Sequence, residues 1–189
     1  MSLARERFWP TRPRCEPRTA TRWRCSHRSA VARLTLESPA DVRLLDKGLS
    51  AGEALAAFNA THDHAGGIAS FLGKVRPGED VKALELTHYE PLTLPGMEKL
   101  AGQALDRFAL DGVLVWHRVG TMQPGEGIVL VAAAARHRRA AFDAVDYLMD
   151  HLKSAAWFWK RERRGDGANG AWHWIEPRGD DHAALARWK

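Results

Sequence analysis

Cysteine is absent from residues 30–189, because both cysteines of the chain, Cys15 and Cys25, lie near its start. This absence excludes a disulfide framework, a cysteine nucleophile and a cysteine-based metal site from that region. The sequence also lacks any run approaching the roughly 20 apolar residues that a membrane span requires. A P-loop, a dinucleotide-binding glycine motif and a Ser-His-Asp pattern are missing as well. We therefore expect a soluble, cytoplasmic protein with no membrane partner.

Excess positive charge is confined to the start of the chain. The net charge is +5, from 28 basic and 23 acidic residues. Residues 1–29 contain eight arginines and two glutamates, which leaves 20 basic and 21 acidic residues in the remainder. The remainder is thus nearly neutral, so general nucleic-acid binding by the folded part loses most of its support.

Residues 1–30 are predicted to form a disordered, arginine-rich tail, because they contain several prolines and show no apolar periodicity. They lack the apolar core of a secretory signal, and the prolines do not fit the amphipathic helix of a transit peptide. We favour a third interpretation, in which the protein starts near Val31 and the tail is upstream sequence translated in error. Residues 31–189 are expected to form one domain with a substantial core.

Alternating apolar patterns predict an α+β fold in which antiparallel sheet dominates. Strands are expected at Val31–Leu36, Ile68–Val75, Val81–Tyr89, Val113–Val119, Ile128–Ala135, Trp157–Arg161 and Trp172–Ile175. Turn residues in the loops 124–127 and 165–170 predict two hairpins, which join the last two pairs of these strands.

Helix signals separate the strands. Helices are expected after the capping-box pattern Ser50-Ala51-Gly52-Glu53, after Pro91 and Pro95 as far as Phe108, from Arg138 to Lys153, and, capped by Asp181, up to Trp188. The two longer helices would cover the sheet with their apolar stripes.

Two lysines, Lys153 and Lys160, flank the aromatic run Trp157-Phe158-Trp159. An ammonium group is usually kept in bulk water, because its desolvation is costly. The pattern therefore indicates a half-buried pocket for an anionic ligand, or a lysine whose proton must be mobile. The alternative is a core strand whose lysines extend to solvent at each end.

Two further cationic clusters lie at the ends of regular elements. Arg136-His137-Arg138-Arg139 stands where a strand leads into a helix, a place where backbone N–H groups already favour anions. Gly73-Lys74-Val75-Arg76 stands at a strand end before a turn. The first of these clusters is also explained as a solvated basic turn, and each is a weak signal alone, so only their combination points to a ligand.

The histidines give little support for a metal site. His62 and His64 form an H-x-H pattern without a third ligand nearby in the sequence. His117 stands among valines in a predicted strand, which indicates a packed side chain. We expect neither a metal ion nor another cofactor.

Several motifs together resemble one known family. These are Phe71-Leu72-Gly73-Lys74-Val75-Arg76, Leu86-Thr87-His88-Tyr89, His117-Arg118-Val119-Gly120, Arg136-His137-Arg138, Lys153 with Trp159-Lys160-Arg161-Glu162, and Ala186-Arg187-Trp188. In this order, over residues 31–189, they resemble the large, catalytic subunit of molybdopterin synthase.

The resemblance implies an α/β hammerhead fold, with mainly antiparallel sheet, two longer helices and a small β-hairpin subdomain. It also implies a homodimer that becomes a heterotetramer by binding two small ubiquitin-like carrier subunits. Each carrier would bring a C-terminal thiocarboxylate, and its sulfur would pass to cyclic pyranopterin monophosphate to build molybdopterin. A body without cysteine fits this chemistry, because the sulfur must then arrive on another protein.

The resemblance also assigns roles to individual residues. It implies that Lys153 and Lys160 are catalytic. The substrate-binding positions that it implies are Phe71, Arg76, His137, Arg138, Glu162 and Arg178. We expect Lys153 to act at the carrier's terminal carbonyl and Lys160 at the pterin, with Arg138 and Lys160 crowded against Lys153.

The sequence departs from the family in two places. The family usually has a proline before the aromatic pair and often an arginine two residues after the first lysine, where this chain has Trp157 and Ala155. The link from Tyr89 to Met97 is also longer than is typical. These departures affect the expected geometry of the pocket and leave every residue with a chemical role in place.

Two other functions are compatible with the residues. One is a non-catalytic module that binds the tail of a ubiquitin-like protein, although such a module would not need a phosphate site. The other is an RNA-binding α+β domain that uses the basic tail, which predicts strongly salt-dependent binding.

Overall fold

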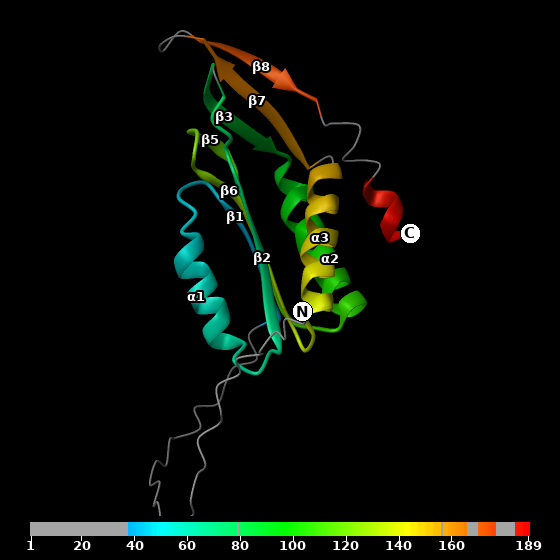
Figure 1. The fold of residues 1–189 in the computed structure, drawn as a ribbon. Helices are drawn as coiled ribbons and strands as arrows, with labels where there is room; N and C mark the ends of the chain where they lie inside the picture. The colour runs from blue at the N-terminus through cyan, green and yellow to red at the C-terminus, as the bar shows by residue number, and fades with distance from the viewer. Residues whose placement is uncertain (1–37, 79, 156, 166–169, 177–183) are drawn as a thin grey trace, which may run out of the picture. The chain divides into compact units, whose positions relative to one another are not determined.

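The structure is a computed structural model that describes residues 38–78, 80–155, 157–165, 170–176 and 184–189. In this part the chain forms an α+β fold with two four-stranded sheets, which we call sheet A and sheet B (Figure 1). The predicted fold class is confirmed, and β1–β4 is the one parallel pair among the described strands. The predicted tail at 1–30, the strand at Val31–Leu36 and the cap at Asp181 lie outside the described residues.

Sheet A has the strand order β1-β4-β6-β2. Its strands are β1 (Ala40–Leu45), β2 (Gly67–Lys74), β4 (Leu110–Arg118) and β6 (Gly127–Ala135). Seven successive residues of β6 are buried, because helices cover both faces of the sheet. The predicted β4–β6 hairpin pairing is confirmed, whereas the sequence reading missed β1.

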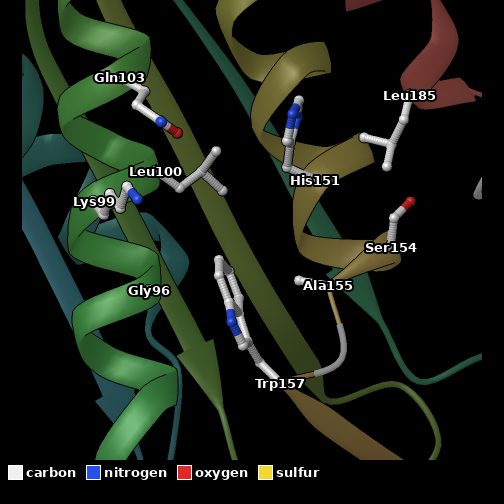
Figure 2. A pocket seen from close by; sticks show the side chains of 9 residues that line it. All are labelled: Gly96, Lys99, Leu100, Gln103, His151, Ser154, Ala155, Trp157 and Leu185. Atoms are coloured by element: carbon white, nitrogen blue, oxygen red, sulfur yellow. The ribbon is translucent and has the colours of Figure 1, made fainter.

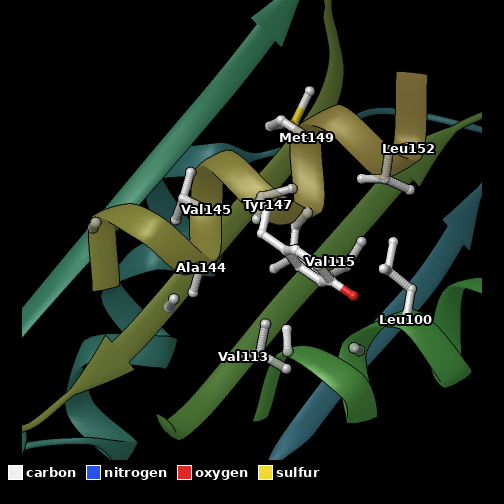
Figure 3. Close-up of a cluster of buried hydrophobic side chains, with 14 of the residues drawn as sticks. Leu100, Val113, Val115, Ala144, Val145, Tyr147, Met149 and Leu152 are labelled. Atoms are coloured by element: carbon white, nitrogen blue, oxygen red, sulfur yellow. The ribbon is translucent and has the colours of Figure 1, made fainter. Parts of the chain in front are cut away.

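Two helices cover one face of sheet A and a third covers the other (Figure 1). They are α2 (Glu90–Phe108) and α3 (Arg138–Ser154) on one face, and α1 (Ala51–Thr61) on the other. Figure 3 shows the core under α2 and α3, where Val113 and Val115 of β4 meet apolar side chains of both helices. The stripe predicted for α3 is confirmed, since Leu148 is fully buried and Leu152 nearly so.

Sheet B has the strand order β5-β3-β7-β8, and every pair in it is antiparallel. Its strands are β3 (Val81–His88), β5 (Gly120–Met122), β7 (Phe158–Arg164) and β8 (Ala171–Ile175). The predicted hairpin of β7 and β8 is confirmed. The turn after β2 closes no hairpin, because it carries the chain from sheet A into sheet B.

The helix boundaries correct three details of the sequence reading. α1 begins after Ser50 as expected, but the Ser50 side chain makes no capping hydrogen bond. α2 begins at Glu90, so Pro91 lies in its first turn and Pro95 inside it, instead of both preceding the helix. Proline is tolerated in the first turn because the N–H there has no partner within the helix.

The chain ends in the short 3₁₀ helix η2 (Leu185–Trp188), close to the expected position. Trp188 Nε1 donates to Asp150 Oδ2 at 2.7 Å, and Arg187 lies 2.6 Å from the same carboxylate. These contacts hold η2 against α3. Across the described residues, no helix is both long and apolar enough to cross a membrane.

Candidate active site

One end of sheet A meets the start of β7, and this junction organises the candidate site. His117, Val129 and Gly73 occupy one row across β4, β6 and β2. The ring of Phe158, the first residue of β7, stacks on His117 with 4.0 Å between centroids and 13° between planes. This stacking fixes the start of β7 against the row.

Both candidate catalytic lysines lie at this junction. Lys153 is in the last turn of α3, where its side chain is exposed, and its charge also suits the helix dipole. Lys160 is the third residue of β7 and is half-buried. It stands opposite Leu86 of β3 and Ile175 of β8, so it shares the face of sheet B that packs toward Leu86.

Two of the candidate binding residues come to the same end of sheet A from β2. Phe71 lies opposite the core residue Val131, on the face covered by α3, and is 41% exposed. Arg76 follows the end of β2 and is exposed. Backbone hydrogen bonds fix the residue before it, because Val75 N donates to Glu126 O and Gly125 N donates to Val75 O, each at 2.8 Å.

Glu162 shares the face of β7 that carries Lys160, because it lies opposite Leu84 of β3. Its side chain is 16% exposed and forms an ion pair with Arg164 at 2.9 Å. The carboxylate is thus half-buried and its charge is partly neutralised by Arg164. It lies two residues after Lys160 in β7, on the same face of the strand.

His137 and Arg138 lie at the opposite end of α3. Arg138 is the first residue of this helix and lies beside Gly67, at the end of sheet A where Gly67 of β2 pairs with Ala135 of β6. At about 1.5 Å per residue, the 15 residues from Arg138 to Lys153 span about 22 Å along the helix. The expected crowding of Lys153 by Arg138 is therefore wrong within one chain. Arg178 lies outside the described residues.

Two buried polar residues, His117 and Arg118, lie next to the junction, and of these only the packing of His117 was predicted from the sequence. Arg118 is 5% exposed, its NH1 lies 3.5 Å from Glu126, and its Nε has no partner among the described residues. Burial lowers the pKa of His117 to about 4, so its ring is neutral near pH 7, as expected for a packed histidine. Its Nδ1 carries the proton, because it bonds to the carbonyl oxygen of Arg118 at 2.8 Å. The only sequence signal was the motif that contains both residues.

His62, the first residue of the H-x-H pattern, has a structural role at the end of α1. His62 Nδ1 donates to the Phe58 carbonyl oxygen at 2.8 Å, and the two rings lie 4.3 Å apart. Within the described ranges, no group of three His, Cys, Asp or Glu side chains could hold a metal ion.

A pocket of about 300 Å³ lies between α2 and the end of α3 (Figure 2). It contains none of the residues predicted for the site. Its lining residues are Gly96, Lys99, Leu100, Gln103, His151, Ser154, Ala155, Trp157 and Leu185. The pocket touches the candidate site only through Ser154, Ala155 and Trp157, which follow Lys153 in the chain.

Comparison with known proteins identifies the family. The model of the family described as "MoaE protein" matches residues 44–155, which is more than half of the chain. The chain belongs to the MoaE protein family. Within it, the molybdopterin synthase catalytic subunit of Caulobacter vibrioides is 44% identical over 148 residues, which cover 78% of this chain and 96% of that protein. The subunit of the same name from Mesorhizobium japonicum is 41% identical over 149 residues, covering 78% of this chain and 92% of that protein.

Solved structures of MoaE proteins share the fold. The molybdopterin cofactor biosynthesis protein E of Burkholderia multivorans matches with a TM-score of 0.66 and 38% identity, over 79% of this chain and 96% of that one. A complex of subunits 1 and 2 of the molybdopterin-converting factor from Helicobacter pylori matches with a TM-score of 0.61. Its chain is 21% identical, over 72% of this chain and 91% of its own, so this likeness concerns the fold alone.

Proposed function

We propose that this MoaE-family chain is the catalytic subunit of a molybdopterin synthase. It would transfer sulfur from the C-terminal thiocarboxylate of a small ubiquitin-like carrier to cyclic pyranopterin monophosphate. The observation that supports the proposal is that the ring of Phe71 reaches Gly73, in the row of His117, while Phe158, which lies between Lys153 and Lys160 in the chain, stacks on His117. Its relatives named molybdopterin synthase catalytic subunit support the same activity.

The electrostatics suit two anionic substrates. Both the thiocarboxylate and the cyclic phosphate are negatively charged, and the junction offers Lys153, Lys160 and Arg76 from three different elements. A charge pair 4 Å apart is worth roughly 4 kcal/mol at an effective dielectric constant near 20. A few such contacts can orient the two reactants and stabilise the charge that develops at the acyl carbon.

Each residue then has a separate task. Lys153 stabilises the tetrahedral oxyanion at the carrier's terminal carbonyl or relays its proton, and Lys160 assists at the pterin. Phe71 offers an exposed ring at the edge of the site, and Glu162 balances the charge beside Lys160. The phosphate-binding group in this proposal comprises Arg76, His137, Arg138 and Arg178.

A homodimer would bring His137 and Arg138 to a lysine site although α3 separates them from the lysines of their own chain. His137 and Arg138 lie about 22 Å from Lys153 along the helix, so they would serve the lysine site of the partner copy. We propose that each copy also binds one carrier, which gives a heterotetramer.

Mixing two inactive variants tests the shared site. A Lys153→Ala chain and an Arg138→Ala chain each lose activity alone, but their heterodimer retains one intact site. If subunits mix randomly, we expect about a quarter of the wild-type rate per chain. A mixture as inactive as its components would contradict a shared site, and mixing Lys153→Ala with Lys160→Ala is the control that stays inactive.

The proposed function itself is tested by a product assay. The full chain is mixed with a thiocarboxylated carrier and cyclic pyranopterin monophosphate, and dithiolene product is measured. A chain that binds the carrier tail without forming product would instead be the non-catalytic module. The predicted cytoplasmic location is tested separately, by fractionation of the cells that produce the protein.

A further inference from the structure

Trp157 stands where the family usually has a proline, inside the link at 155–157 that joins α3 to β7. Figure 2 shows its indole between α2 and α3. A Cβ placed on Gly96 of α2 would lie 2.6 Å from indole atoms Cε2 and Cζ2. That separation is shorter than any van der Waals contact between carbon atoms. The indole therefore rests directly on the α2 backbone, and only glycine at position 96 leaves room for it.

A backbone contact holds the same residue to the same helix. Thr93 of α2 is fully buried, and its Oγ1 lies 3.3 Å from the Trp157 carbonyl oxygen. The same hydroxyl lies 2.9 Å from the carbonyl oxygen of Tyr89, in the residue that precedes the helix. The link is thus attached to the first turns of α2 by both the side chain and the backbone of Trp157.

Two of the three departures of this sequence from the family pattern, Trp157 and the longer segment between Tyr89 and Met97, are therefore in contact. The long segment between Tyr89 and Met97 folds as the first turns of α2. This segment supplies both Thr93 and Gly96, which are the two contacts of Trp157. Trp157 therefore packs against the part of the chain that is longer than is typical of the family.

The link lies between the two candidate catalytic lysines. α3 ends one residue after Lys153, and β7 begins two residues before Lys160. A proline would stiffen such a link by fixing its φ angle. In this chain the indole of Trp157 restricts the same link by packing against α2.

We infer that Trp157 is a positioning residue that sets the placement of Lys153 relative to Lys160, with Gly96 as its required partner. The inference rests on the proposed sulfur transfer. Trp157 contributes no charge or proton to the reaction, so it acts on the geometry of the two lysines. Small misplacements of reacting groups reduce kcat strongly while substrate binding changes little.

The test measures kcat and the carrier KM of the full chain, well below the unfolding temperature of every variant. Trp157→Ala should lower kcat about tenfold or more, with little change in KM. Trp157→Pro should recover most of the loss, because proline restores stiffness by the other route. A Trp157→Ala variant with wild-type kcat would overturn the inference, as would a Trp157→Pro variant as slow as Trp157→Ala.

Gly96→Ala tests the required partner. Its methyl group must displace the indole, so it should lower kcat, and in the Trp157→Ala background it should have no further effect. Gly102→Ala is the matched control, because it lies in the same helix with nothing within 4 Å of an added Cβ. Equal kcat for the Gly96→Ala and Gly102→Ala variants would contradict the role of the contact.

The melting temperature separates this inference from the proposed function. Alanine favours a helix over glycine, so Gly96→Ala should raise Tm when Trp157 is already alanine and lower it when Trp157 is present. The sign of this Tm difference can be measured whether or not the chain is an active enzyme. If the wild-type chain makes no product, the proposed function fails while the contact is still tested. If the wild-type chain is active and Trp157→Ala is equally active, only the positioning role fails.

Discussion

Sheet A and sheet B each have four strands, but the central strands β6 of sheet A and β7 of sheet B differ in burial. Seven successive residues of β6 in sheet A are buried, whereas no residue of β7 in sheet B is. Helices cover both faces of sheet A, while sheet B has a small core on one face, formed by Val75, Leu84, Leu86 and Met122. A charged side chain in β6 would lose its hydration on either face, but in β7 it stays partly hydrated. This difference explains why Lys160 lies in sheet B, while sheet A holds the start of the same strand through the stacking of His117 on Phe158.

The largest effect on stability should come from the core of sheet A. Leu148→Ala removes a fully buried side chain between α3 and the sheet, so we expect a loss of about 2–5 kcal/mol in the free energy of unfolding. Denaturant unfolding measures this loss. Trp174→Ala on sheet B, where the side chain is 64% exposed, is the comparison and should cost far less. Equal losses would mean that sheet B contributes as much to stability as sheet A.

The largest effect on activity should come from the lysines at the junction. Lys153→Ala and Lys160→Ala should each lower kcat about 100-fold or more, because removal of one group that stabilises developing charge typically has this effect. Turnover with a thiocarboxylated carrier is the measurement, with Tm recorded for each variant. Lys82→Ala, on an exposed position of β3, serves as the control and should retain its activity. Near-normal turnover of Lys153→Ala would remove this residue from the mechanism.

The same contrast between the sheets explains what the sequence could predict. β4 and β6 were predicted correctly because burial on both faces leaves a continuous apolar run, and α3 because burial of one face leaves a helical repeat. β1 lies at the edge of sheet A and has no buried residue, so its pattern was too weak to find. The start of α2 was missed because Pro91 and Pro95 are normally signals of a helix boundary.

The candidate site was predictable as a set of residues but only partly as an arrangement. The family resemblance assigned roles to Lys153 and Lys160, and no local pattern gives the distance between helix ends. The position of Arg138 depends on the length of α3 and on which end of it meets sheet B. The contact between Gly96 and Trp157 joins residues 61 positions apart. Such a contact becomes visible only when α2 and the link are packed together.

An intermediate effect should appear in the pH dependence of stability. Burial lowers the pKa of His117 to about 4, whereas an unfolded histidine has a pKa near 6.5. The unfolded chain therefore binds more protons between these values, and stability should fall as the pH drops from about 6.5 toward about 4. The contribution is at most about 3 kcal/mol at the acid end. His117→Phe keeps a ring against Phe158 but cannot titrate, so its free energy of unfolding should depend less on pH.

Denaturant unfolding at several pH values between 4 and 7 measures the effect of His117. His64→Gln is the matched control, because His64 is exposed and its replacement should leave the slope unchanged. An identical pH slope for the wild type and His117→Phe would show that other groups cause the acid sensitivity.

The smallest effect should come from the outer face of sheet B, which is the face opposite to its small core and carries Arg161 and Glu85. Arg161 forms an ion pair with Glu85 across β7 and β3, and its guanidinium lies 4.8 Å from the centre of the Trp172 ring. Hydrogen bonding to Glu85 raises the pKa of Arg161, but both groups remain accessible to water and salt. Glu85→Gln should therefore lower Tm slightly, and the difference from wild type should shrink as salt is added. Arg161→Lys should cost more than loss of the ion pair alone, because lysine cannot keep the planar stacking on Trp172. A salt-independent loss for Glu85→Gln would mean that this face is screened from solvent, and that sheet B is more like sheet A than its exposure suggests.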